Sequence, residues 1–239
     1  MGGQACVFYG AAQVSRDIDL VLLASPENFN RLESALLQLE AERIAVPPFS
    51  PEILHQGHAV HFRCAAANVQ DLRIDVMTRL RGVLPFELLW ERRTVIQDSS
   101  GTVFSLLSVP DLVQAKKTQR SKDWPIIELL VAIHYRENSK DPRQDWIEFW
   151  LREARTPELI SELVRRFPDE TNALRTVRPL LAIAPSAHME ELRKALDEEV
   201  RNEQAVDRLY WAPLKAELEK FRHAEVRQSA DSENRQKLR

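Results

Sequence analysis

Residues 1–20, MGGQACVFYGAAQVSRDIDL, contain the motif from which the fold of this chain is predicted. Asp17 and Asp19 stand two positions apart at the start of an apolar segment. Because successive side chains of a strand point to opposite faces, Ile18 and Leu20 can enter a core while both aspartates share the other face. An isolated Asp-x-Asp is often only a polar strand end. Two carboxylates on one exposed face nevertheless suit Mg²⁺ or Mn²⁺, which bind oxygen ligands and leave positions for water and phosphate.

A pair of glycines precedes these acids. The order Gly2-Gly3, spacer, Asp, apolar, Asp, apolar resembles the signature of the nucleotidyltransferase superfamily related to polymerase beta. In that family a Gly-Gly or Gly-Ser turn holds the phosphates of a nucleotide, and the two acids hold metal. The resemblance therefore implies that Gly2 and Gly3 bind nucleotide phosphate and that Asp17 and Asp19 bind Mg²⁺ or Mn²⁺.

Length and composition set wide limits. The 239 residues allow one compact domain with a helical extension or two small domains. A net charge of −3 gives no overall basic excess of the kind typical of nucleic-acid binding. Cys6 and Cys64, the only cysteines, are too few for a disulfide framework or a cysteine zinc site, so a reducing cytoplasm is expected. No apolar run is long enough to span a bilayer and no secretion signal is recognisable, so no membrane partner is expected.

Helix and strand signals alternate in the first half of the chain. A short helix is predicted over 3–10 and a strand over 17–23. Ser25 is a suitable N-cap and Pro26 suits the first turn of a helix whose apolar residues recur on one face. The prolines within 46–51 cannot continue that helix and predict a loop.

Two further strands are predicted at 60–64 and 72–76, where apolar and polar residues alternate, with a hairpin connection between them. Asp75 lies on the polar face of the second strand. If this strand neighbours the strand of Asp17 and Asp19, facing side chains are about 5 Å apart, and three carboxylates can surround one or two metal ions. A lone strand aspartate is usually just exposed, but Leu-Arg-Ile-Asp-Val around Asp75 also resembles the strand that carries the family's third acid.

A second motif follows the last expected strand, 103–107. Ser108 begins a helix that carries Lys116, and Asp123 follows it. The run resembles the Pro-acid-Leu, Lys, Lys-Asp pattern of bacterial nucleotidyltransferases of the abortive-infection toxin type. The resemblance implies that Lys116 and Asp123 bind the nucleotide and that a cognate antitoxin is a partner. A helix lysine is equally often a solvated surface group, so both interpretations of Lys116 stay open.

The predicted fold class is α+β, with a small mixed nucleotidyltransferase sheet flanked by helices and followed by a C-terminal helical domain. The predicted parts are a nucleotidyltransferase domain at 1–110, a helical domain at 111–227 and a disordered tail at 228–239. Within the helical domain, Pro213 is expected to interrupt the last helix.

Three features depart from the family pattern. Only Met1 precedes Gly2, whereas the family has a strand there, so the natural start is expected upstream. Gln13 stands where an arginine is common, and Ser15 occupies the usual threonine place, which makes it a nucleotide-binding candidate. Ile126 replaces an acid that often follows the Lys-Asp pair. Weakened or lost activity is therefore one expectation.

Two other candidate sites receive an ordinary structural interpretation. His55, His58 and His61 are three apart, but they cross a glycine and lack carboxylate or cysteine partners at zinc-ligand spacing. Cys6 has no histidine beside it in sequence, so a small buried residue is expected rather than a nucleophile.

The resemblance implies transfer of a nucleoside monophosphate from a nucleoside triphosphate such as ATP to an acceptor hydroxyl, with release of pyrophosphate. Asp17, Asp19 and Asp75 would hold the metal ions, and Asp75 is the best candidate to assist deprotonation of the acceptor. The acceptor stays open between RNA, a protein and a small molecule. The alternatives are an inactive relative that binds a nucleotide or a partner, and an unrelated α+β protein in which the acids are incidental.

Overall fold

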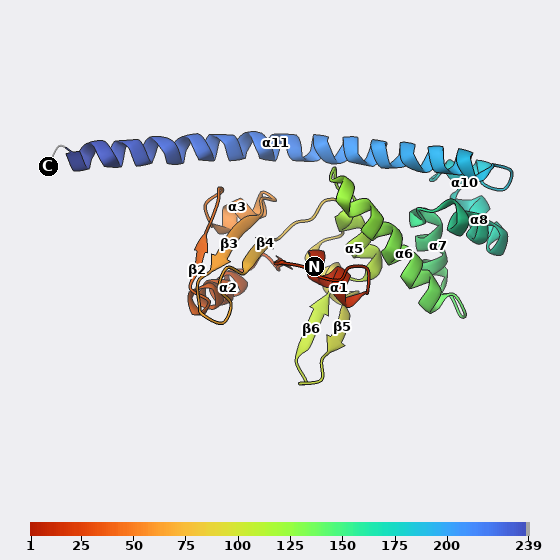
Figure 1. Cartoon of the computed structure of the whole chain (residues 1–239), viewed down its shortest axis with the longest axis horizontal. Coiled ribbons are helices and arrows are strands. Elements are labelled where there is room, and N and C mark those ends of the chain that lie inside the picture. The colour runs from red at the N-terminus through yellow and green to blue at the C-terminus, as the bar shows by residue number, and fades with distance from the viewer. Residues whose placement is uncertain (238–239) are drawn as a thin grey trace. The chain divides into compact units, whose positions relative to one another are not determined.

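The structure, a computed structural model, describes the backbone of residues 1–237 and the side chains as far as residue 227 (Figure 1). It confirms the predicted α+β class. The chain forms two compact units, each assembled from separate segments. Unit 1 contains Met1–Gln4, Ser15–Glu91 and Arg208–Arg239, and unit 2 contains Ala5–Val14 and Arg92–Asp207.

Unit 1 is built on a four-stranded mixed sheet in the order β1-β4-β3-β2. The strands are β1 (Asp17–Val21), β2 (Ala41–Arg43), β3 (Val60–Cys64) and β4 (Arg73–Met77). β1 and β4 are parallel, and the β4–β3 and β3–β2 pairs are antiparallel. Three of these strands match the predicted ones. The three-residue β2 was not predicted, because it is too short to show a period of two.

Side-chain caps set where the helices of unit 1 begin. The Ser25 hydroxyl accepts a hydrogen bond from the Asn28 amide and caps α2 (Pro26–Gln38), as predicted. Ser50 caps α3 (Pro51–His55) in the same way, and a proline at the first helical position follows each cap. The unpredicted α3 therefore has the same start signal as α2. A further helix, α4 (Phe86–Glu91), completes the unit before its last segment.

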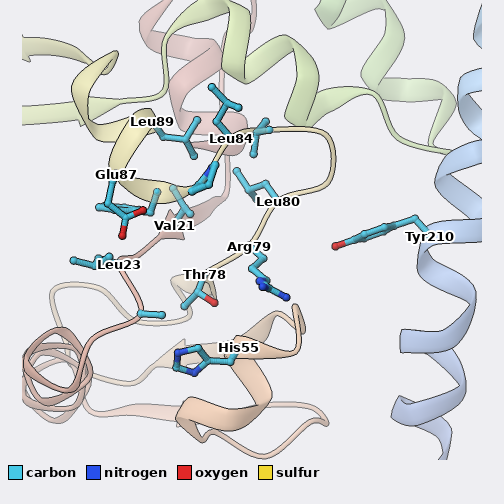
Figure 2. A pocket seen from close by; sticks show the side chains of 14 residues that line it. Val21, Leu23, His55, Thr78, Arg79, Leu80, Leu84, Glu87, Leu89 and Tyr210 are labelled. Carbon is cyan, nitrogen blue, oxygen red and sulfur yellow. The ribbon is translucent and has the colours of Figure 1, made fainter.

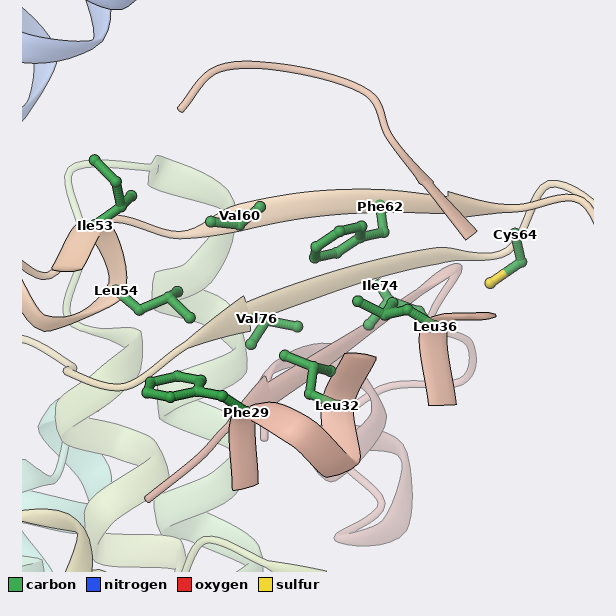
Figure 3. Packing of buried hydrophobic residues seen from close by; sticks show 10 residues of the cluster. All are labelled: Phe29, Leu32, Leu36, Ile53, Leu54, Val60, Phe62, Cys64, Ile74 and Val76. Atoms are coloured by element: carbon green, nitrogen blue, oxygen red, sulfur yellow. The ribbon is translucent and has the colours of Figure 1, made fainter. Parts of the chain in front are cut away.

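One apolar cluster holds unit 1 together (Figure 3). Val60, Phe62 and Cys64 of β3 alternate with polar residues and face the cluster, as do Ile74 and Val76 of β4. The residues that α2 and α3 contribute are Phe29, Leu32, Leu36, Ile53 and Leu54. The two helices therefore cover one face of the sheet, and the polar residues of the strands are left on the other face.

The last helix, α11 (Met189–Lys237), contributes to both units. It runs through Pro213, so the predicted interruption there is wrong. A proline inside a helix removes one hydrogen bond, but contacts can offset that loss. Leu214 is buried, the Glu217 carboxylate lies 2.8 Å from His58, and Phe221 packs against the apolar cluster.

Unit 2 contains a hairpin and a set of helices (Figure 1). Helix α1 (Gly2–Phe8) begins in unit 1 and ends in unit 2, where Phe8 contacts Phe104 of the hairpin formed by β5 (Thr94–Gln97) and β6 (Val103–Leu106). The helices that follow are α5 (Val109–Lys116), the 3-10 turn η1 (Ser121–Asp123), α6 (Trp124–Asn138), α7 (Gln144–Glu153), α8 (Pro157–Arg166), α9 (Pro168–Leu174) and α10 (Leu180–Ile183). Ser108 caps α5, as predicted.

The predicted division into 1–110 and 111–227 stays a prediction, since the compact units interleave in sequence. Helix α11 extends through residue 237, into the tail for which disorder is predicted, and residues 238–239 lie outside the described residues. Among the described residues, every helix is too short or too polar to cross a lipid bilayer.

Candidate functional site

The polar face of the sheet in unit 1 carries the three predicted acids. β1 and β4 are neighbours, and Asp19 stands directly opposite Asp75 in their register. Asp75 in turn stands opposite His61 of β3. Two positions earlier on the same two strands, and therefore on the same face, Asp17 stands opposite Arg73. The structure therefore brings the three acids together on one face, and it adds two basic residues to them.

Both oxygens of the Asp75 carboxylate are engaged. Oδ1 accepts hydrogen bonds from Nε of Arg73 at 2.8 Å, and Oδ2 accepts one from the Arg73 Nη2 at 3.0 Å. Nδ1 of His61 lies 2.8 Å from Oδ1. Burial raises the pKa of Asp75, but the hydrogen bonds from His61 and Arg73 outweigh it, so the net shift of the pKa is downward. Asp75 is thus an ionised carboxylate held by two basic side chains.

Arg73 is the cation that the three acids share. Its hydrogen bond to Asp75 raises the pKa of the guanidinium against the opposing effect of burial, and the charges of Asp75, Asp17 and Asp19 raise it further. The guanidinium therefore lies in the field of all three carboxylates. A divalent cation at the same acids would compete with it.

The predicted phosphate turn packs against Asp19. The Gly3 amide donates a hydrogen bond to Asp19 Oδ2 at 3.2 Å. Gly2 has φ +66°, and a Cβ on it would lie 1.8 Å from the same oxygen. A Cβ on Gly3 would lie 2.4 Å from the Ser15 hydroxyl, which itself donates to the backbone oxygen of Asp17. Both glycines are therefore needed for this close approach, and the Gly3 amide, expected at a phosphate, binds an acid of the chain instead.

The second predicted pair, Lys116 and Asp123, lies in unit 2. Lys116 is buried, and its Nζ donates to Asp123 Oδ1 at 3.4 Å, so it is not a solvated surface lysine. Asp123 also accepts from the Thr118 hydroxyl at 2.6 Å and from Arg120 Nε at 2.8 Å. The predicted pair is therefore in contact within unit 2. That it meets the acids of unit 1 at one nucleotide stays a prediction.

Arg73 and His61 were not predicted from the sequence as members of this cluster. The signal was present, because the alternation that placed Asp75 on the polar face also placed both basic residues there. The three histidines considered for zinc have separate surroundings. His61 contacts Asp75, the buried His58 contacts Glu217, and His55 Nδ1 lies 2.6 Å from the Pro51 carbonyl oxygen.

The donor set of the acid cluster fits a hard cation in chemistry, because all three candidate ligands are carboxylates. The positions of these side chains have to be considered separately from their chemistry. In the part of the chain that the structure describes, no three histidine, cysteine or acidic side chains are grouped to hold a metal ion. Arg73 also donates to both oxygens of Asp75. Metal binding by all three acids therefore requires Arg73 to move.

Comparison of the chain with protein-family models and with curated protein sequences finds no match. A function is consequently inferred from the motif and from the geometry of the acid cluster.

Proposed function

We propose that this protein is a metal-dependent nucleotidyltransferase, which moves a nucleoside monophosphate from a nucleoside triphosphate to an acceptor hydroxyl and releases pyrophosphate. The observation that carries the proposal is the register of β1 and β4, in which Asp19 faces Asp75 while Asp17 shares their face. The packing of Gly2 and Gly3 against Asp19 supports the proposal, because this contact brings the glycine pair of the sequence motif to one of its acids.

Each residue has a role in this proposal. Asp17, Asp19 and Asp75 would hold Mg²⁺ or Mn²⁺, which supplies Lewis-acid polarisation of the phosphate when bound. Asp75 would take the proton of the acceptor hydroxyl, and the amides of Gly2 and Gly3 would donate to phosphate oxygens. Ser15 supports the glycine turn, and Lys116 with Asp123 is proposed at the nucleotide. The acceptor class and a partner antitoxin stay open within the proposal.

One observation favours a second candidate, a catalytically inactive module that binds a nucleotide or a partner. Arg73 and His61 contact Asp75, and the Gly3 amide donates to Asp19, so two of the three acids have internal partners without a metal ion. Buried charges that are paired in this way are a common structural arrangement. The two candidates differ in whether the acids exchange their internal partners for metal and nucleotide.

The test uses the full chain with each of four α-labelled nucleoside triphosphates, Mg²⁺ or Mn²⁺, and total cell RNA or lysate. We expect one acceptor to gain label and pyrophosphate to be released in equal amount. Asp19→Asn should abolish the transfer. Asp71→Asn is the matched control, because Asp71 is an exposed acid with φ +63°, a conformation that asparagine tolerates.

The outcomes separate the candidates. Label transfer lost in Asp19→Asn but kept in Asp71→Asn supports the enzyme. Metal-dependent nucleotide binding without pyrophosphate release in any extract supports the inactive module. No metal-dependent nucleotide binding at all excludes the enzyme and a nucleotide-binding module, and leaves a partner-binding module or an α+β protein whose acids have a structural role.

A further inference from the structure

A cavity of about 490 Å³ lies within unit 1, beside the ends of two of its strands (Figure 2). Its lining includes Val21, the last residue of β1, and the segment that begins at Thr78, directly after β4. Since β1 and β4 are parallel, both leave the sheet at the same edge. Ligands of open α/β sheets bind beyond the carboxyl ends of such strands, and the volume suits a small molecule.

One side of the cavity is apolar. Leu80, Leu84 and Leu89 lie together there, as Figure 2 shows. Leu84 is 44% exposed, although it is a large aliphatic side chain. An exposed aliphatic side chain that lines a cavity gains free energy when an apolar ligand covers it.

The other side carries hydrogen-bond donors. In Figure 2 the Arg79 guanidinium points into the space between Thr78, His55 and the Tyr210 hydroxyl. Arg79 makes no hydrogen bond or ion pair with any residue that the structure describes. The Thr78 hydroxyl is occupied, because it donates to the Leu54 carbonyl at 2.6 Å. The cation of the cavity is therefore Arg79, and it has no internal anion.

Glu87 limits what the cavity can accept. It is the acid among the lining residues, and in Figure 2 it lies beside Leu23, on the side away from Arg79 and Tyr210. An anionic group near Arg79 avoids it, whereas a second negative charge at the far end of a ligand would be repelled. The lining thus combines one unpaired cation, an apolar wall and a distant acid.

We propose that this cavity binds a small amphipathic anion, in which a carboxylate or a phosphate contacts Arg79 and an apolar group covers Leu80, Leu84 and Leu89. The proposal is independent of nucleotidyl transfer, because it uses none of the three acids of the polar face. Arginine favours these headgroups, since its planar fork donates two parallel hydrogen bonds to them.

The test titrates the full chain by isothermal calorimetry with five probes: octanoate, octyl phosphate, 1-octanol, octylammonium and inorganic phosphate. We expect at least one amphipathic anion to bind ten-fold or more tightly than the alcohol, the ammonium and inorganic phosphate. Tighter binding of octanoate than of octyl phosphate assigns a carboxylate headgroup, and tighter binding of octyl phosphate assigns a phosphate. Either result supports the proposal.

Variants test the assigned contacts. Arg79→Gln should weaken the anion by about 10- to 100-fold, the range for loss of a charge-assisted hydrogen bond, and leave 1-octanol unchanged. Leu84→Asn should weaken octanoate and 1-octanol together. Arg31→Gln is the matched control, because Arg31 lies on α2, its guanidinium donates to the Asn28 side chain at 3.2 Å, and it does not line the cavity. Thermal unfolding checks that each variant folds.

The proposal is overturned by three results. One is the absence of binding by both amphipathic anions to the folded wild-type protein. The second is an affinity for octanoate and for octyl phosphate that is no higher than the affinity for 1-octanol, which would mean that no cation is used. The third is an Arg79→Gln variant that folds and retains the wild-type preference for the anion.

Discussion

Among the single residues of the acid cluster, Arg73 decides whether the acids are free to bind a metal ion. Its guanidinium donates two hydrogen bonds to Asp75 and lies in the field of Asp17 and Asp19. An arginine cannot lose its charge near neutral pH, so a metal ion has to displace it rather than wait for its deprotonation. Metal affinity is therefore expected to be lowered by Arg73.

Arg73→Gln should raise the affinity of the chain for Mn²⁺ by about ten-fold, because the competing charge is removed. Mn²⁺ titration followed by electron paramagnetic resonance measures it. Arg63→Gln is the control, since Arg63 stands opposite Arg73 on the same face but pairs with the exposed Asp71 at 3.7 Å. Equal Mn²⁺ affinity in the wild type and in Arg73→Gln would contradict the competition.

At the level of secondary structure, His134 connects helices α6 and α7 of unit 2. It lies on α6, and its ring contacts the rings of Trp146, Phe149 and Trp150 of α7 at centroid distances of 5.5, 5.3 and 5.9 Å. Trp150 Nε1 donates a hydrogen bond to His134 Nδ1 at 2.9 Å, which requires that nitrogen to be unprotonated. Burial lowers the pKa of His134 to about 4.

The pH dependence follows from the direction of that shift. Between pH 6.5 and about 4, unfolded His134 takes up a proton that the folded protein does not, so the free energy of unfolding falls as the pH falls. The loss is about 1–2 kcal/mol after allowance for the partly solvated ring. Urea unfolding at several pH values across this range measures the slope.

His134→Asn should flatten this slope, because asparagine offers Trp150 an acceptor that does not titrate. The variant is expected to be less stable at pH 7, since it loses the ring contacts with α7. His223→Asn is the control, because His223 is exposed on α11. An unchanged slope in His134→Asn would show that other groups cause the pH dependence.

At the scale of the whole molecule, the last helix completes the first unit. The Glu217 carboxylate contacts His58, which is 1% exposed, Phe221 packs against the apolar cluster, and Glu225 pairs with Arg43 at 2.7 Å. The partners of these three residues precede them by more than 140 positions. Unit 1 therefore folds fully only after residues 208–227 are present.

Phe221→Ala should destabilise unit 1 and leave unit 2 unaffected. Truncation of a partly buried phenylalanine that packs on a core costs about 2–3 kcal/mol, somewhat below the value for full burial. Hydrogen exchange followed by mass spectrometry should then show faster exchange in β3 and β4 and an unchanged rate in α6. Lys220→Gln, at the exposed neighbouring position, should change neither, and faster exchange throughout both units would contradict the division.

Features that depend on neighbours along the chain were predictable from the amino-acid pattern alone. Alternation placed Ile74 and Val76 on one face and Asp75 on the other, and serine followed by proline predicted where α2 begins. These features are readable because strand and helix periods and N-caps are local.

Contacts between residues that are distant in sequence could be identified only in the folded protein. In the fold, Asp19 faces Asp75, and Arg73 donates to Asp75. Lys116 is buried against Asp123, and His58 contacts Glu217. Helix α11 also continues through Pro213, against the local preference. The physical reason is that strand order and charge pairing are set by contacts between distant segments, and these contacts can outweigh a local signal worth a few kcal/mol.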